Sequence, residues 1–146
     1  MVSLKNNRQS LKMEGKNKLI MYVDDDPDDR EFLADAIREK DPAIDVLLAE
    51  NGVEALHQLS DMKQAHSPMP SLIVLDFNMP FLNGKETLDE LRKDDQLQEV
   101  PVIIFSSSER PHDKELFDEL GIEYFVKPIE LSYFNWIASH MVSYCL

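Results

Sequence analysis

Leu72-Ile73-Val74-Leu75-Asp76-Phe77-Asn78-Met79-Pro80 is the stretch that decides the fold. An apolar run with β-branched residues at its centre leads into a single aspartate, and Met79-Pro80 then prevents a regular helix or strand from continuing. A short apolar run that ends at such a breaker predicts a buried strand of a parallel sheet. Ligands bind these sheets outside the carboxyl ends of the strands. Asp76 is therefore predicted to be a catalytic or binding group, with a helix cap as the alternative.

Other apolar runs on both sides of this stretch alternate with amphipathic segments of helical period. The further expected strands are Leu19–Val23, Ile44–Ala49, Pro101–Phe105 and Glu123–Val126. The expected helices end before Pro42, begin after the cap Asn51, open at Gly84, run from Pro111 to Gly121, and close the chain. The helix residues expected on buried faces include Phe32, Leu33, Ile37, Val53, Leu59, Leu88, Leu91, Phe117, Leu120, Leu131, Phe134 and Ile137. Strictly alternating strands and helices predict an α/β fold, a doubly wound parallel sheet with helices on both faces.

Length and composition predict one globular domain over residues 18–146, with no second or output domain. The net charge of −13 is uneven, because residues 1–18 are basic and the rest of the chain is strongly acidic. An acidic body argues against DNA or RNA as a partner. Residues 1–17 are interpreted as a flexible tail, with contact to a membrane or nucleic acid as the alternative. No apolar run reaches membrane-spanning length, no signal peptide is visible, and Cys145 is the only cysteine, which together favour a cytoplasmic protein.

A run of acidic residues follows the first expected strand. Asp26 suits the cap of the next helix, and Asp28 and Asp29 suit its first turn, where the helix dipole favours negative charge. Asp24 and Asp25 are left at the strand end without a capping role. Carboxylates that converge there with Asp76 repel one another unless a cation lies between them, and hard oxygen ligands suit Mg²⁺.

Two more polar side chains follow the later strands. Ser106, the first of three serines after the fourth strand, is placed to hydrogen-bond a charged oxygen on Asp76. Lys127 directly follows the fifth strand and precedes a proline, where its ammonium can contact a phosphoryl oxygen. Acids, a metal, a hydroxyl and a lysine around one aspartate are the groups that phosphoryl transfer to a carboxylate requires.

These motifs resemble the receiver domain of bacterial two-component response regulators over residues 19–146. The resemblance lies in Val23-Asp24-Asp25, in Leu75-Asp76-Phe77-Asn78-Met79-Pro80 with Gly84 after it, in the hydroxyl of Ser106, and in Tyr124-Phe125-Val126-Lys127-Pro128. The acidic entry and the Ser143-Tyr144-Cys145-Leu146 ending look most like the single-domain regulators that partner phytochrome-type kinases. The resemblance implies a flavodoxin-like sheet with strand order 2-1-3-4-5.

It also implies a function and a role for each matching residue. Asp76 would accept a phosphoryl group from a phosphohistidine of a sensor histidine kinase or a histidine phosphotransfer protein, with no further enzymatic activity than its own phosphorylation and dephosphorylation. Asp25, Asp76 and the Asn78 carbonyl would bind Mg²⁺ directly, and Asp24 through water. The implied phosphoryl contacts are Ser106, the Ser107 amide and Lys127, and the implied switch residues are Ser106 and Tyr124. The Lys127–Pro128 bond is expected to be cis.

The resemblance further implies that the signal leaves by protein contact. The implied surface is the face made by the helix that starts at Pro111, the strand Glu123–Val126 and the last helix. Homodimerisation is left open. Two departures stand out: Ser106 replaces the commoner threonine, and Asp26 adds a negative charge beside the metal pair.

Two other functions are alternatives to this one. A haloacid-dehalogenase-like phosphohydrolase also uses an aspartate after a strand, but it needs a second aspartate two residues on, where this chain has Asn78. A degenerate receiver that serves only as a docking scaffold would lack one of the reactive residue types, and all of them are present. A stable beryllofluoride adduct on Asp76 would separate the three.

Overall fold

The sheet of this protein is parallel throughout, with the strand order 2-1-3-4-5. The computed structural model describes residues 18–146, and the tail predicted for residues 1–17 lies outside the described residues. The strands are β1 (Leu19–Val23), β2 (Asp45–Ala49), β3 (Leu72–Leu75), β4 (Val102–Ser106) and β5 (Glu123–Val126). The predicted α/β fold and strand order are confirmed.

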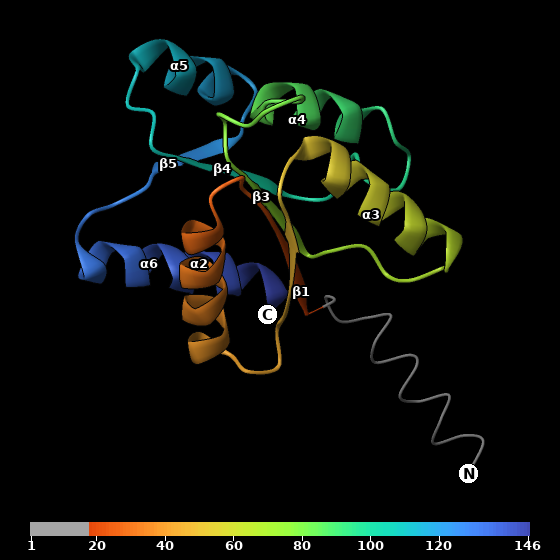
Figure 1. The fold of residues 1–146 in the computed structure, drawn as a ribbon, viewed down its shortest axis with the longest axis horizontal. Coiled ribbons are helices and arrows are strands. Elements are labelled where there is room, and N and C mark those ends of the chain that lie inside the picture. Colours follow the sequence, from red (N-terminus) through yellow and green to blue (C-terminus); the bar gives the residue numbers. More distant parts are fainter. Residues whose placement is uncertain (1–17) are drawn as a thin grey trace.

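Helices cover both faces of the sheet (Figure 1). On one face lie α2 (Pro27–Lys40) and α6 (Leu131–Val142), with the short 3₁₀ helix Ser143–Cys145 after α6. On the other lie α3 (Gly52–Gln64), α4 (Gly84–Arg92) and α5 (Pro111–Glu119). Within residues 18–146, no helix combines the length and the hydrophobicity that crossing a bilayer requires.

The alternation of side chains along each strand divides the core into two layers. Ile20 and Tyr22 of β1 pack with α2 and α6, whereas Met21 and Val23 pack on the opposite face of the sheet. The central strand β3 is buried on both faces along its whole length. Successive side chains of the run before Asp76 therefore face the two core layers in turn, and every one of them has to be apolar.

Polar side chains start three of the helices as capping residues. The Asp26 carboxylate accepts hydrogen bonds from the Asp28 and Asp29 amides, which confirms its predicted role as the cap of α2. Asn51 caps α3 as predicted. Asn83 forms a reciprocal capping box with Glu86 and so fixes the first turn of α4.

Several details differ from the sequence-based expectation. Ser106 is the last residue of β4 and not the first residue after it. Four residues expected on buried helix faces are about half exposed or more: Phe32, Val53, Leu120 and Leu131. The last three lie in the first turn of a helix or directly after its last residue. Helical periodicity gives the direction of a side chain but not the extent of the surface that it faces.

Candidate functional site

The candidate site lies at the carboxyl edge of the sheet, where β1 lies between β2 and β3. Val23 pairs with Leu75 in the parallel register, so the next residues, Asp24 and Asp76, end neighbouring strands at the same edge. The Asp76 amide donates to the Val23 carbonyl at 2.9 Å, which fixes this arrangement. The strand order reverses between β1 and β3, and such a point is where doubly wound sheets bind ligands.

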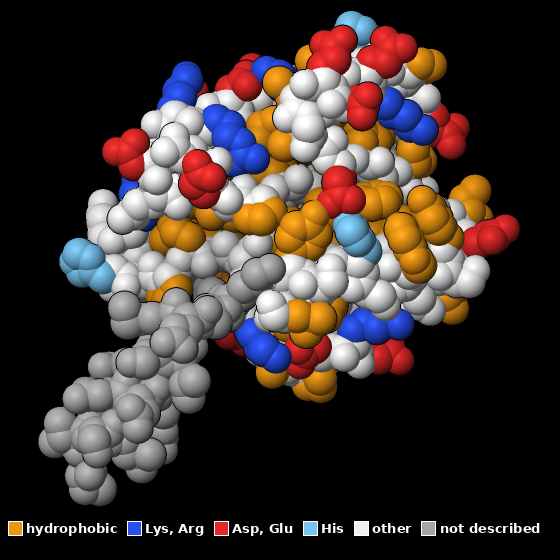
Figure 2. Space-filling model, turned by 180° about the vertical axis from the view of Figure 1, so that it is seen from behind, with side chains coloured by type: hydrophobic (Ala, Val, Ile, Leu, Met, Phe, Trp, Pro, Cys, Tyr) orange, Lys and Arg blue, Asp and Glu red, His pale blue; other side chains and the backbone are white. Residues whose placement is uncertain are grey.

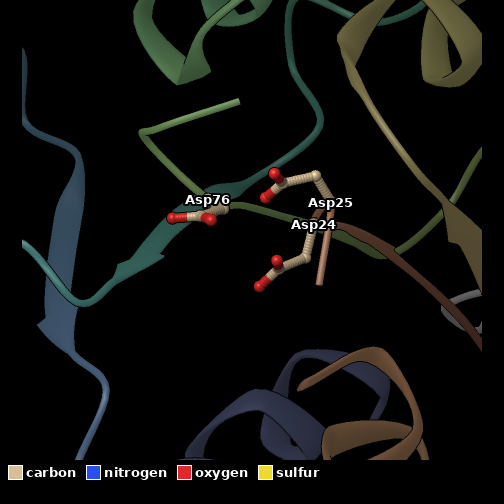
Figure 3. Close-up of side chains that lie close together, drawn as sticks. All are labelled: Asp24, Asp25 and Asp76. Atoms are coloured by element: carbon tan, nitrogen blue, oxygen red, sulfur yellow. The ribbon is translucent and has the colours of Figure 1, made fainter. Parts of the chain in front are cut away.

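Three carboxylates converge at this edge. Asp24, Asp25 and Asp76 each offer an oxygen, and these oxygens lie within 4.8 Å of one another (Figure 3). Asp24 is 0% and Asp76 6% exposed, whereas Asp25 is exposed to solvent. Within the described part of the chain, Oδ1 of Asp76 is buried and has no hydrogen-bond partner. Clustered hard oxygen donors, one of them unpartnered, fit a divalent cation of the Mg²⁺ type.

Lys127 reaches this cluster from the end of β5. Its Nζ lies 2.6 Å from Oδ2 of Asp24, 2.8 Å from Oδ2 of Asp29, and 3.6 Å from Oδ2 of Asp76. Burial alone would lower the pKa of Lys127, but these carboxylates outweigh it and hold the pKa above its ordinary value. The lysine is therefore charged and offsets part of the repulsion between the acids.

Asp76 has the environment of a reactive carboxylate. Burial raises its pKa, the Lys127 ammonium and the Ser106 hydroxyl act in the opposite direction, and the charges of Asp24 and Asp25 raise it again, to about 6. Ser106 is fully buried, so its hydroxyl is held close to the edge. A raised pKa means that the ionised form of Asp76 is high in free energy. A cation or an electrophile that binds to the carboxylate lowers that free energy.

Three further groups hold Asp24 besides Lys127. The Tyr22 hydroxyl donates to its Oδ2 at 2.5 Å, the Asp26 amide donates to its Oδ1 at 2.9 Å, and Arg30 donates to its backbone carbonyl at 2.8 Å. Burial, together with the Asp24 charge, raises the pKa of Tyr22, which keeps the phenol protonated as a donor. Asp24 is thus fixed in the core rather than free to rotate.

Two residues that the sequence pattern did not single out as site residues belong to this cluster. Tyr22 was expected only as part of the strand Leu19–Val23, although the two-residue period of a strand places it on the same side as Asp24. Asp29 lies in the first turn of α2 as predicted, but its carboxylate also pairs with Lys127. No local signal separates an acid that only complements the helix dipole from one that also contacts a residue 98 positions away.

The loop after Asp76 needs Gly84. The Gly84 amide donates to the Phe77 carbonyl at 2.8 Å. A Cβ at residue 84 would lie 2.6 Å from the Asp76 carbonyl oxygen, which is too close for any other residue type without a backbone shift. Asn78, in the loop between Asp76 and Gly84, is exposed.

The other predicted residues lie around β4 and β5. The Lys127 amide donates to the Ser106 carbonyl at 2.8 Å and so ties the ends of these strands together. Ser107 follows in an exposed loop, and the Tyr124 hydroxyl donates to the Ser108 carbonyl at 2.9 Å. One expectation was wrong: no peptide bond in residues 18–146 is cis, so Lys127–Pro128 is trans. Trans is intrinsically favoured by about 0.5–1 kcal/mol, and the exposed loop that follows leaves it unhindered.

Comparison with known proteins identifies the family. The family model described as the response regulator receiver domain matches residues 20–134. The chain belongs to the response regulator receiver family. This confirms the resemblance drawn from the sequence motifs.

Relatives with known names are similar over most of the chain. Response regulator Rcp1 of Synechocystis is 26% identical over 75% of this chain and 75% of its own length. The polar-differentiation response regulator DivK of Brucella anthropi is 30% identical over 80% and 89%. Three other curated relatives are longer, and the chain spans only 24% to 40% of them.

Solved structures of response regulators are also similar to this chain. The phosphorylated cyanobacterial phytochrome response regulator RcpA is 27% identical, with a TM-score of 0.76 over 90% of this chain and 94% of its own. A structure described as the Mn²⁺-bound form of Rcp1 shares the fold, with a TM-score of 0.71 over 87% and 93% at 24% identity. The likeness to phytochrome-associated regulators that the sequence suggested is therefore confirmed.

Proposed function

We propose that this receiver accepts a phosphoryl group on Asp76 from a phosphohistidine of a sensor histidine kinase or a histidine phosphotransfer protein. The observation that carries the proposal is Oδ1 of Asp76, a buried oxygen without a partner among the described residues. It lies among the groups that phosphoryl transfer needs, namely two further carboxylates, the Lys127 ammonium and the buried Ser106 hydroxyl.

The chemistry assigns a role to each residue. An Asp76 carboxylate oxygen attacks the phosphorus, and the P–O bond forms as the P–N bond of the phosphohistidine breaks. The histidine ring, already protonated on its other nitrogen, takes the electron pair of the P–N bond and leaves as neutral imidazole. Ser106 and the Ser107 amide hold phosphoryl oxygens, and Lys127 donates to the acyl phosphate. Lys127 is then shared between the new anion and the acids that it contacts now. Ser106 and Tyr124 are proposed to change conformation with phosphorylation.

A divalent cation, Mg²⁺ in our proposal, would be held by Asp25, Asp76 and the Asn78 carbonyl, with Asp24 acting through water. The converging carboxylates and the Mn²⁺-bound form described for the relative Rcp1 support this. When bound, the cation neutralises negative charge that develops on the transferred group.

The donor protein is proposed to dock around the mouth of the site. Three apolar side chains near the carboxyl edge are exposed: Phe32 in α2, Phe81 in the loop after Asp76, which is 81% exposed, and Ile129 after Pro128. A pocket of 190 Å³ beside Lys127 is lined by Phe32, Pro128 and Phe134. A donor that buries these groups brings its imidazole to Asp76 and gains hydrophobic binding energy at the same time.

The output surface is proposed to be the face of α5, β5 and α6. A groove of 560 Å³ there is lined by apolar residues that include Ile122 and Phe125 and by acidic residues that include Glu115 and Asp118. Beside it Trp136 is 54% exposed and stacks on Tyr133 and His140. Figure 2 shows hydrophobic side chains gathered around a histidine on this side of the molecule. A basic, partly apolar protein surface complements this face, and a second copy of the chain is the alternative.

The remaining expectations follow from this proposal. The acidic body argues for protein partners rather than DNA. A donor kinase delivers its phosphoryl group in the cytoplasm, where we expect the protein to act. Residues 1–17 are proposed to be a tail outside the receiver.

The test is direct phosphorylation. The protein is incubated with acetyl phosphate, with Mg²⁺ or EDTA, and the intact mass is measured. We expect a phosphoryl-sized mass increase that needs the cation, is absent from Asp76→Asn, and persists in the matched variant Asp28→Asn, whose residue is exposed in the first turn of α2. An adduct that survives in Asp76→Asn would show that another residue accepts the group.

A further inference from the structure

Several hydrogen bonds of the loop between β4 and α5 meet at one residue of that loop, Ser108. Its amide donates to the Ser106 hydroxyl oxygen at 3.3 Å, and its carbonyl accepts from the Tyr124 hydroxyl at 2.9 Å. Its own hydroxyl donates to Oδ2 of Asp113 at 2.7 Å and accepts from the Arg110 amide at 3.4 Å. Ser108 thus connects the hydroxyl beside Asp76, the aromatic ring of β5 and the first turn of α5.

Asp113 anchors this junction. It is the third residue of α5 and only 5% exposed, which is unusual for an acid without a charged partner inside the core. Its Oδ2 also accepts from Nε of Arg110 at 3.2 Å, but the Arg110 side chain is largely exposed, so this ion pair is weak. Arg110 makes no side-chain cap bond to the helix. The carboxylate of Asp113 therefore serves mainly to hold Ser108 in the helix entry.

The position of Ser108 affects the reactive edge through Ser106. A serine hydroxyl has one proton to donate and two acceptor sites. While its oxygen accepts from the Ser108 amide, its proton is left for Asp76 or for an oxygen bound to Asp76. The same residue fixes Tyr124, whose ring also packs on Phe117 of α5 at 5.8 Å.

We propose that Asp113 is a positioning residue of the phosphorylation site: by holding Ser108 it orients the Ser106 hydroxyl toward Asp76 and keeps Tyr124 attached to the loop. The proposal rests on the function proposed above. In this role Asp113 arranges the site before a phosphoryl group binds. Losing it lowers the fraction of molecules that are ready to bind, and the apparent Kd rises by the inverse of that fraction.

The test measures beryllofluoride binding in Mg²⁺, with beryllofluoride as the phosphoryl analogue. We expect Asp113→Ala and Ser108→Ala each to raise the Kd for beryllofluoride about threefold to tenfold. The Kd of the double variant should not exceed that of the single variant with the higher Kd. Asp113→Asn keeps an acceptor oxygen for Ser108 and should stay within about twofold of wild type. Glu119→Ala, at an exposed acid of the same helix, is the matched control and should bind as wild type does.

A second readout needs no ligand. In the metal-free protein, Asp113→Ala and Ser108→Ala should shift the NMR signals of the Tyr124 ring in the same way and leave those of Tyr22 unchanged. A role limited to helix stability would lower the melting temperature without this paired change. Should Asp113→Ala fail to fold, Ser108→Ala tests the same bond from its other end.

The outcomes separate the two proposals. If the wild-type protein does not bind beryllofluoride, the proposed function is wrong. If both alanine variants bind beryllofluoride as tightly as the wild type, the positioning role is overturned. It is also overturned if the effects of the two substitutions add in the double variant, because Asp113 then does not act through Ser108.

Discussion

Replacing Asp76 with asparagine should stabilise the fold while it removes the phosphorylation site. Burial and the neighbouring acids raise the pKa of Asp76 from 3.8 to about 6. A raised carboxyl pKa means that the folded protein keeps a proton that the unfolded chain has released. Stability is therefore present at low pH and is lost as the pH rises through about 4 to 6. Above that window the ionised Asp76 costs about 3 kcal/mol, since each pKa unit corresponds to about 1.4 kcal/mol.

Asparagine has nearly the same shape and no charge, so it avoids this cost. Lys127 loses only its longest contact, at 3.6 Å, and keeps Asp24 and Asp29 at 2.6 and 2.8 Å. We therefore expect Asp76→Asn to raise the free energy of unfolding by up to about 3 kcal/mol at pH 8 and by about half as much at pH 5.

The assay is urea unfolding in EDTA at both pH values. Asp28→Asn is the matched control, because Asp28 is exposed in the first turn of α2 and its loss should be neutral or slightly destabilising. Millimolar Mg²⁺ should reduce the difference between wild type and Asp76→Asn, since the cation offsets the same repulsion. A gain that is equal at pH 5 and pH 8, or that Asp28→Asn reproduces, would refute the reasoning from a buried charge.

Three further predictions concern the same edge. Mg²⁺ should stabilise the wild type by about 2.7 kcal/mol at a hundredfold excess over Kd, seen as a melting temperature that rises with Mg²⁺ and falls back in EDTA; an unresponsive melting temperature would count against the metal site. Lys127→Met leaves the fully buried Asp24 without its cation and should cost about 3–5 kcal/mol in urea unfolding with EDTA, while exposed Lys114→Met should not; equal losses would mean that the ion pair does not matter. Gly84→Ala places a Cβ against the Asp76 carbonyl and should cost about 1–3 kcal/mol and weaken beryllofluoride binding; wild-type behaviour would show that the loop is looser than its geometry indicates.

Much of the fold could be predicted because its signals are local. The apolar run before Asp76 had to be buried on both faces, so it indicated a central parallel strand before any contact was known. The caps Asp26 and Asn51 were readable because a cap bonds amides only two or three residues away.

The residues of the site could also be predicted from local signals. Asp24, Asp76, Ser106 and Lys127 each stand at the end of an expected strand, and the carboxyl ends of parallel strands meet at one edge. The register of β1 and β3 then places the two aspartates side by side without further information.

What the sequence alone determined about this protein is therefore the order of its elements, the edge at which they end and the residue types gathered there. Only the tertiary structure decided which partners those residues take: Asp29 as a second anion for Lys127, Tyr22 as the donor to Asp24, and Asp113 as the anchor of Ser108. Periodicity and capping patterns act over a few residues, whereas the Lys127–Asp24 contact joins positions 103 apart. Such partners are chosen by how whole strands and helices pack, because burial leaves each charged group only the neighbours that packing brings within reach.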